Sequence, residues 1–250
     1  MDIREVPQGN FNRHPWEISR TEMLLGTLDK YTGDIRKEAD SLVVADIGAG
    51  DMYFDKVYLE RFPQDKIFAV DIGYTDFSSD RDNLFMSNTL EQVPEPLFDM
   101  TFSLNSLEYI PDEKEFLKKL SNRLRPGGLI FFILPAHRFL FSEHDVFVKG
   151  LRRYGRKEFK RLIESVDELE LLDSFYFYAS LFAIRGAEKM LRIPTDRAQK
   201  NVPSWRYSAE HPVTRLFTAF LNADFKLCYL LSRLKIRVPG LSILAVCVRK

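Results

Sequence analysis

The sequence holds little cysteine and little histidine. Two cysteines, Cys228 and Cys247, are too few for a disulfide framework or for a zinc site with four thiolate ligands, so we expect a reducing compartment and no bound metal. No stretch of 18 apolar residues is present, and the N-terminal sequence MDIREVPQGN lacks the apolar core of a secretory signal. These absences predict a cytoplasmic protein without a membrane-spanning helix.

Net charge is also missing, because 36 Lys and Arg residues balance 36 Asp and Glu residues. A neutral chain gives no sign of a partner that is bound by charge alone, such as nucleic acid. The charges are nevertheless unevenly placed. Residues 180–250 contain 13 basic and 4 acidic side chains, a net of +9, which leaves −9 for residues 1–179. The sequence therefore predicts an acidic part followed by a basic one.

What is present is a regular alternation of strands and helices. Hydrophobic residues make up 45% of the chain, which is enough for a sizeable core. Short apolar runs separated by helical patterns are typical of βαβ units. The runs are residues 42–47, 67–70, 84–87, 98–104, 129–135, 170–178 and 241–248. We predict an α/β fold with a doubly wound, Rossmann-like, seven-stranded sheet, whose last strand returns antiparallel beside the sixth.

The same patterns divide the single domain predicted for residues 1–250 into four parts. These are an N-terminal helical cap (1–40), a ligand-binding core (41–178), a helical basic insertion (179–238) and a final strand (239–250). Each part joins the next without a linker of low complexity, so we expect one compact unit.

Two features stand out inside the basic insertion. Residues 193–205, IPTDRAQKNVPSW, are rich in chain breakers and predict a loop. An apolar stripe is expected to pack against the sheet or against the helix at 179–192 rather than on a lipid surface. Its members are Val213, Leu216, Phe217, Phe220, Leu221, Cys228, Leu231 and Leu234.

A glycine turn follows the first predicted strand, with Gly48 and Gly50 ahead of a helix. Glycines there let the backbone approach a ligand, and the helix start offers free N–H groups, although such a turn also serves simply to pack a strand on a helix. Asp71 stands 21 residues after Gly50, a spacing at which an acid binds ribose hydroxyls. The turn and the acid together predict a nucleoside cofactor.

Two cofactor classes share this arrangement. The dinucleotide fingerprint G-x-G-x-x-G needs a third glycine at position 53, where this chain has Tyr53, whose ring would crowd a pyrophosphate. What remains is acid-x-G-x-G, led by Asp46. That pattern resembles the first motif of class I S-adenosylmethionine-dependent methyltransferases, and a NAD-dependent oxidoreductase stays as the alternative.

The resemblance to this family extends over residues 42–136. VVADIGAGD, IFAVD, FDMTFSLNSLEYI and RLRPGGLIFFILPA are similar, in this order, to its successive motifs, and RRY with the terminal GLSILAVCVRK is similar to an uncharacterised bacterial branch. The resemblance implies S-adenosylmethionine as cofactor and assigns its contacts to eight residues. They are Asp46, Gly48 and Gly50 around the methionyl part, Asp71 on the ribose, Asn88 and Thr89 at the adenine, and Asn105 and Ser106 along the sulfonium and amino end.

The loop after the fifth predicted strand lies at the carboxyl edge of the sheet, where open α/β sheets bind ligands. Methyl transfer depends mainly on holding donor and acceptor in line, and a base helps where the acceptor must lose a proton. His137 and His144 in this loop are the candidate bases, and Asp145 and Tyr154 complete the predicted catalytic group.

We therefore expect an S-adenosylmethionine-dependent methyltransferase that acts on a small molecule or on a glycan- or lipid-linked acceptor. The basic insertion favours an anionic acceptor, or an anionic membrane surface that presents it to a peripheral protein. Nucleic acid is a lesser alternative, since Trp205 and Tyr207 suit base stacking but no RNA-binding module accompanies them. Met52 replaces a third glycine that the family often has, so a non-catalytic binding protein is a further alternative.

Overall fold

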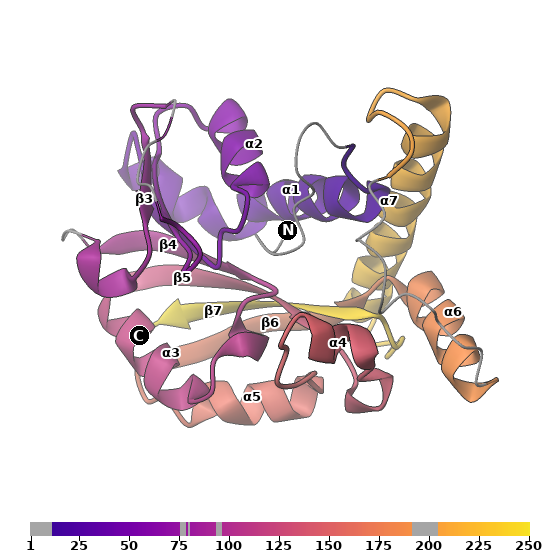
Figure 1. The fold of residues 1–250 in the computed structure, drawn as a ribbon. Helices are drawn as coiled ribbons and strands as arrows, with labels where there is room; N and C mark the ends of the chain where they lie inside the picture. Colours follow the sequence, from indigo (N-terminus) through magenta and orange to yellow (C-terminus); the bar gives the residue numbers. More distant parts are fainter. Residues whose placement is uncertain (1–11, 76–78, 80, 94–96, 192–204) are drawn as a thin grey trace.

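The computed structural model describes residues 12–75, 79, 81–93, 97–191 and 205–250. A seven-stranded sheet runs through its middle (Figure 1). The strands are β1 Val43–Ile47, β2 Lys66–Val70, β3 Leu84–Ser87, β4 Phe98–Leu104, β5 Leu124–Pro135, β6 Leu169–Phe177 and β7 Ser242–Arg249. All seven overlap the predicted apolar runs, although β5 begins earlier than expected. The Rossmann-like, doubly wound sheet is thereby confirmed.

The strand order is β3-β2-β1-β4-β5-β7-β6. The first five strands in this order are parallel, whereas β7 lies antiparallel between β5 and β6. The last strand therefore returns antiparallel beside the sixth, as predicted. The chain moves outward from β1 to β2 and then crosses to β4 on the other side of β1. The carboxyl ends of β1 and β4 thus form the switch point at which such sheets bind ligands.

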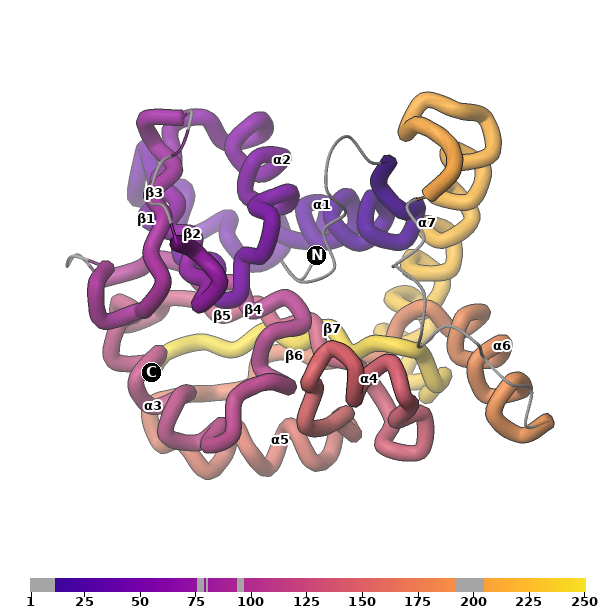
Figure 2. The backbone as a smooth tube through the Cα atoms, in the orientation of Figure 1, coloured from indigo at the N-terminus to yellow at the C-terminus, as the bar shows by residue number. Residues whose placement is uncertain are grey.

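Helices cover both faces of the sheet. One face carries α1 Pro15–Glu38, α2 Tyr53–Arg61 and α7 Pro212–Arg233, and the other carries α3 Glu113–Asn122 and α5 Arg156–Glu164. The short α4 Glu143–Phe147 follows β5, and α6 Ala179–Met190 projects on the same side of the molecule as α7 (Figure 2). The described residues also form the short 3₁₀ helices η2 Leu90–Gln92, η3 Leu107–Tyr109 and η4 Arg138–Leu140.

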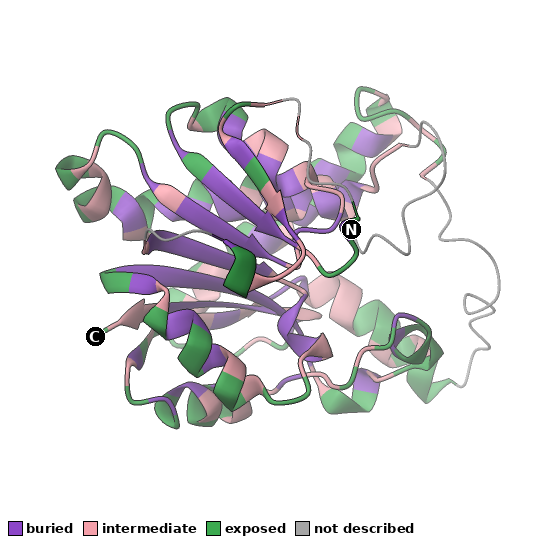
Figure 3. Cartoon of the chain, turned by 60° about the vertical axis from the view of Figure 1, so that its left-hand side comes forward, coloured by how far each residue is buried: buried purple, intermediate pink, exposed green. Residues whose placement is uncertain are grey.

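The core lies on both faces of the central strands (Figure 3). In β5, Ile130 and Phe132 belong to the apolar cluster under α3 and α5, whereas Phe131 and Ile133 belong to the cluster under α1, α2 and α7. All four are buried. This two-sided burial is why β5 is apolar at every position from Leu129 to Pro135 rather than at alternate ones.

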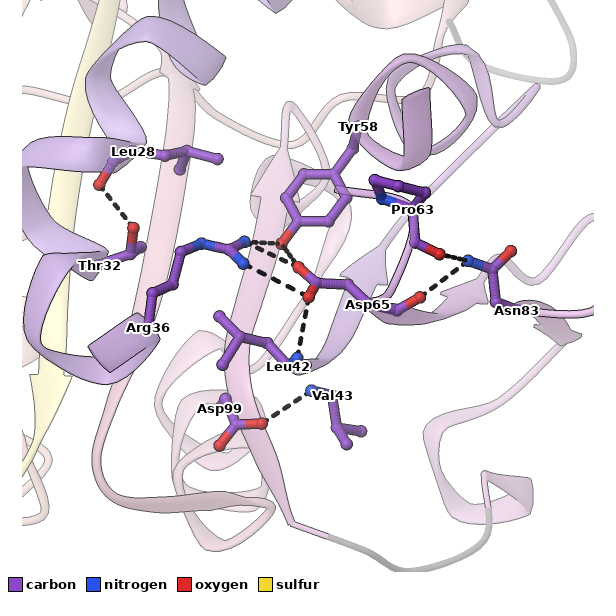
Figure 4. Close-up of polar contacts among 10 residues, drawn as sticks. All are labelled: Leu28, Thr32, Arg36, Leu42, Val43, Tyr58, Pro63, Asp65, Asn83 and Asp99. Carbon is purple, nitrogen blue, oxygen red and sulfur yellow. Dashed lines mark hydrogen bonds and ion pairs between the residues drawn. The ribbon is translucent and has the colours of Figure 1, made fainter. Parts of the chain in front are cut away.

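A buried ion pair fastens α1 to the amino ends of β1 and β2 (Figure 4). The carboxylate of Asp65 accepts hydrogen bonds from Arg36 Nη2 at 2.7 Å, from the Tyr58 hydroxyl at 2.6 Å and from the Leu42 N–H at 2.9 Å. Asp65 is buried, so the carboxylate depends on these three donors for its solvation. The network lies at the edge opposite the switch point and fixes where β1 begins.

The apolar stripe of the insertion is only partly buried, which contradicts the prediction that it packs inward. Leu221 and Cys228 do pack toward α1 and β6, but Leu216, Phe220 and Leu234 are exposed. The reason is that α7 has apolar residues on its buried face and on its exposed face, both at intervals of three and four residues. The predicted stripe contains residues from both faces. The loop predicted at 193–205 lies outside the described residues except for Trp205.

Candidate functional site

The turn between β1 and α2 uses glycine where the backbone is left-handed. Gly48 has a φ of +77° and Gly50 a φ of +58°, a region that residues with a Cβ rarely adopt. A Cβ added to Gly48 would stand 2.4 Å from the Cβ of Ser106. The glycine turn therefore lies directly on the segment after β4, which brings together two parts of the predicted cofactor site.

The carboxylate of Asp71 joins this turn to the end of β2. Its Oδ2 accepts the N–H of Gly50 at 3.0 Å, and its Oδ1 accepts the N–H of Gly73 at 2.9 Å. Each carboxylate oxygen has a second lone pair. Asp71 is thus held in place by the backbone and keeps acceptor capacity for a ribose diol.

Four carboxylates surround the turn. They are Asp46, Asp51, Asp55 and Asp71, and the negative charge of each raises the pKa of Tyr74. The Tyr74 hydroxyl donates a hydrogen bond to the carbonyl of Gly50 at 2.8 Å. Burial, followed by these negative charges, raises the pKa of Tyr74. The phenol therefore stays a donor and ties the turn to the loop after β2.

Two of these carboxylates are buried and unpaired. Burial raises the pKa of Asp46 well above its usual range and that of Asp55 to about 7. Among the described residues, Asp46 Oδ1 and both carboxylate oxygens of Asp55 lack a hydrogen-bond partner. A cation close by would lower the cost of ionising them. The positively charged sulfonium of S-adenosylmethionine fits this site.

Met52 adopts the left-handed conformation that the missing third glycine would favour, with a φ of 57°. Its side chain is half-buried and packs against the apolar cluster that contains Phe54 and Tyr58. The thioether is therefore accommodated in the core packing, while the backbone keeps the shape of a glycine turn.

The predicted adenine end follows β3. The side-chain oxygen of Asn88 is buried and has no partner within the described part of the chain, so it is available to accept from an exocyclic amine. Thr89 is engaged locally, because its hydroxyl accepts the N–H of Gln92 at 3.3 Å and caps η2. Asn88 thus keeps a buried, unpaired acceptor just after β3.

Helix α1 brings Arg20 to the switch point. Its Nη1 donates to the side-chain oxygen of Asn105 at 3.1 Å, and its guanidinium lies over the ring of Trp16 at 4.6 Å. Asn105 itself is left-handed, with a φ of 58°, and Ser106 beside it shares a hydrogen bond of 2.7 Å with the hydroxyl of Ser103. The predicted sulfonium end is therefore rigid on both sides.

His137 follows β5 and is enclosed by aromatic rings. It stacks on Tyr176 and contacts Phe182, each with ring centroids 4.8 Å apart. Burial lowers its pKa, and a hydrogen bond to the backbone of Gly240 acts in the opposite direction. Its Nε2 has no partner among the described residues. A neutral imidazole with a nitrogen that makes no hydrogen bond is the form that a general base needs, and here this nitrogen is buried.

The other predicted catalytic residues make structural contacts. The buried carboxylate of Asp145 accepts the N–H and the hydroxyl of Ser142, each at 2.8 Å, and Arg153 Nε at 2.8 Å. The hydroxyl of Tyr154 donates to Glu113 at 2.5 Å. His144 lies on the exposed side of α4, where partial burial lowers its pKa. Of the four residues, His137 has the geometry that suits proton transfer best.

Sequence reasoning missed Arg20, Asp55, Tyr74 and Glu108. Glu108 is buried with an unpaired Oε2, and burial raises its pKa to about 8 although Arg153 and Arg20 oppose this. A signal existed for Asp55, which lies three residues before a buried tyrosine on one helix face. No local signal existed for Arg20, whose partner lies 85 residues away.

Other site types find little support in the described residues. Nowhere in the described ranges do three His, Cys, Asp or Glu side chains gather as a metal site. No helix described is long and apolar enough to cross a membrane. A shallow cavity of about 190 Å³ lies between α1 and α7, lined in part by Met23, Phe225 and Tyr229. It includes none of the predicted site residues.

Part of this chain is similar in sequence to known methyltransferases. Residues 45–132 match a family model described as a methyltransferase domain. Malonyl-[acyl-carrier protein] O-methyltransferase 2 of Ilyobacter polytropus is 28% identical over 97 residues, which cover 36% of this chain and 38% of that protein. Trans-aconitate 2-methyltransferase of Azoarcus sp. is 27% identical over 103 residues, 39% of this chain and 41% of that protein. The match thus spans about two fifths of these relatives.

Solved structures agree over most of the chain. A provisionally assigned sarcosine dimethylglycine methyltransferase from Galdieria sulphuraria has a TM-score of 0.54 at 13% identity, covering 93% of this chain and 86% of that one. A provisionally assigned methyltransferase in complex with the Trm112 activator of Haloferax volcanii has a TM-score of 0.53 at 14% identity, covering 95% and 98%. At such identities the likeness shows the fold. The matched segment 45–132 contains the glycine turn, Asp71, Asn88 and Asn105, and over this segment the chain is similar to methyltransferases.

Proposed function

We propose that this protein transfers the methyl group of S-adenosylmethionine to an anionic acceptor, either a small molecule or one linked to a carrier such as a lipid or glycan. The observation that carries the proposal is the glycine turn, held by Asp71 and surrounded by four carboxylates. The sulfonium supplies an activated methyl group when the cofactor is bound. The task of this chain is therefore to bind and orient donor and acceptor.

Residues along the carboxyl edge of the sheet each bind a different part of the cofactor. The left-handed backbone at Gly48 and Gly50 meets the methionyl part, Asp71 accepts from the ribose hydroxyls, and Asn88 accepts from the adenine amine. Asn105, held by Arg20, meets the sulfonium and amino end. Burial raises the pKa of both Asp46 and Asp55, and a cation bound beside the turn would favour their ionised forms, which in turn favours a cationic cofactor.

The same charges disfavour a nicotinamide dinucleotide. Its pyrophosphate is negatively charged, and the carboxylates of Asp46, Asp51 and Asp55 lie around the turn on which a pyrophosphate would rest. Tyr53 also occupies the position of the third glycine of the dinucleotide fingerprint.

Ligand-dependent stability separates the two cofactor classes. S-adenosylhomocysteine at a hundredfold excess over its Kd should stabilise the protein by about 2.7 kcal/mol against thermal or denaturant unfolding, and NAD at the same concentration should not. Stabilisation by NAD without any by S-adenosylhomocysteine would sink the proposal in favour of an oxidoreductase.

An anionic acceptor is supported by two observations. The matched relatives are named for malonyl and aconitate acceptors, both of which bear carboxylates. In this chain the positive charges of Arg20 and Arg153 both lower the pKa of the buried Glu108, and Arg20 also donates a hydrogen bond to Asn105. Arg153 is already paired with Asp145, so Arg20 beside Asn105 is the guanidinium that would hold an acceptor carboxylate or phosphate.

The role of His137 can be tested with two acceptor classes. Release of S-adenosylhomocysteine should be measured with carboxylate acceptors and with hydroxyl acceptors. A hydroxyl must lose its proton, so His137→Asn should lower kcat for hydroxyl acceptors by roughly a hundredfold and leave carboxylate acceptors almost unchanged. His144→Asn is the matched control. Cofactor binding without transfer to any acceptor in either class would favour a non-catalytic binding protein.

A further inference from the structure

Helix α7 has an apolar face that points away from the protein. Its inward face packs on α1 and β6 through Thr214, Thr218, Leu221, Phe225 and Cys228. The outward face repeats at intervals of four and three residues, which at 3.6 residues per turn confines it to an arc of roughly 80° and a length of about 27 Å. Its members, which we call the outer stripe, are Leu216, Phe220, Ala223, Leu227, Leu230 and Leu234.

The outer stripe is accessible along its whole length. All six residues are exposed, and the five large ones have between 53% and 69% of their surface accessible. The outward face of a helix in a globular protein is normally polar. A continuous apolar row on the solvent side marks a surface for binding, because scattered exposed residues would not keep one spacing.

Positive charge borders this stripe. Arg215, Lys226 and Arg233 each directly precede a stripe residue, and Lys235 and Arg237 follow its end. The one acid between residues 211 and 237 is Asp224, whose carboxylate caps α6 by accepting the N–H groups of Ala179 and Ser180 at 3.0 and 2.9 Å. Arg233 is paired with Asp173 of β6, and the other cations leave the accessible side of α7 apolar and cationic, without an acid of its own.

Helix α6 extends the same chemistry on the same side of the molecule (Figure 2). None of its residues is buried, and Met190 and the following Leu191 are 86% and 71% exposed. Ile184 is exposed as well, and Arg185 and Lys189 are exposed beside them. Two contacting helices thus offer apolar side chains with neighbouring cations.

We propose that the outer stripe and the exposed side of α6 bind the surface of an anionic lipid bilayer, with the apolar side chains in the headgroup region and the cations on the lipid phosphates. A second copy of the chain fits this face less well. An antiparallel pairing of two outer stripes would bring Lys226 of both copies to the seam, and the outer stripe carries no acid to meet it. Binding to an anionic bilayer through α6 and α7 would also explain why residues 180–250 carry a net positive charge.

Vesicle co-sedimentation tests the proposal without any need for methyl transfer. The protein should bind vesicles of phosphatidylcholine with phosphatidylglycerol, bind pure phosphatidylcholine at least tenfold more weakly, and lose binding as salt is added. Phe220→Glu with Leu227→Glu, and separately Arg215→Glu with Lys226→Glu, should each lower binding by roughly tenfold or more. The matched control is Lys157→Glu with Lys160→Glu on α5, which covers the opposite face of the sheet and should bind as before.

Two controls keep this test decisive. Far-ultraviolet circular dichroism must be unchanged in each variant, which these exposed positions allow. Equal binding to neutral and anionic vesicles, or no vesicle binding at all, would overturn the proposal. So would a dimer in light scattering that Phe220→Glu with Leu227→Glu converts to a monomer, because the occupant of the stripe would then be a second copy.

Discussion

Gly48 and Ser106 lie so close that a Cβ on residue 48 would meet the Cβ of Ser106 at 2.4 Å. Gly48→Ala should therefore destabilise the protein by more than the ~1–3 kcal/mol that a left-handed backbone costs a residue with a Cβ. Chemical denaturation measures the loss. Because the clash moves the turn away from the loop after β4, S-adenosylhomocysteine binding should weaken as well.

Gly127 provides the matched control for this contact. Its φ of +79° nearly equals that of Gly48, but an added Cβ would find no atom within 4 Å. Gly127→Ala should thus show the backbone cost alone. Equal destabilisation by the two substitutions would mean that the close approach to Ser106 is not what selects glycine at position 48.

Asp71→Asn should weaken S-adenosylhomocysteine binding by tenfold or more, equivalent to about 1.4 kcal/mol, in isothermal titration calorimetry. Gly50 and Gly73 donate to different oxygens of Asp71, so an amide keeps an acceptor for only one of these N–H groups. It also loses the charge and half of the acceptor capacity that a ribose diol uses. Asp112→Asn is the control, since Asn caps the start of α3 as well as Asp does. An unchanged Kd for Asp71→Asn would remove Asp71 from the cofactor site.

The charge of Asp55 should distinguish S-adenosylmethionine from S-adenosylhomocysteine, which lacks the positive sulfur. Burial raises the pKa of Asp55 to about 7. As pH rises through that value the carboxylate ionises and attracts the sulfonium, so the ratio of the two Kd values should shift in favour of S-adenosylmethionine. In Asp55→Asn the ratio should stay constant with pH. A constant ratio in the unsubstituted protein would place Asp55 too far from the sulfur to act on it.

Asp65→Asn should cost about 3 kcal/mol of folding free energy, because it leaves the guanidinium of Arg36 and the Tyr58 hydroxyl without their buried anionic partner. Tyr58→Phe removes one hydrogen bond and should cost about 1 kcal/mol. The control is Asp34→Asn, which breaks the exposed ion pair with Lys37 and should leave the free energy of unfolding unchanged. Cofactor affinity of the folded Asp65→Asn protein should stay near normal, since the network lies at the opposite edge of the sheet.

The strands and the glycine turn were predictable because the signal for each lies in a short stretch of sequence. The apolar run of β5 is buried on both faces, and Gly48 and Gly50 stand where the backbone turns left-handed. What could not be predicted depends on distant partners. Arg20 reaches Asn105 across 85 residues, and Asp145 is occupied by Arg153, a contact that removes the open carboxylate expected there.

The two faces of α7 illustrate the same limit. Phe220 and Leu221 are adjacent in the sequence, yet one is exposed and the other is buried. Periodicity alone finds both rows but does not say which of them meets α1. That choice is made by tertiary packing, in which Thr214 and Thr218 lie on the buried side and large apolar residues remain outside.

Glu108 should make folding stability fall as pH rises. Burial raises the pKa of its carboxyl from 4.5 to about 8, so between these values the folded protein holds a proton that the unfolded chain releases. The free energy of unfolding then falls by up to about 1.4 kcal/mol per pH unit from this group and levels off above pH 8. Glu108→Gln imitates the protonated form and should flatten the slope, whereas Glu91→Gln on the exposed side of η2 should keep it. Denaturation midpoints that are equally pH-dependent in all three proteins would show that Glu108 is ionised in the fold, paired with Arg20 or Arg153.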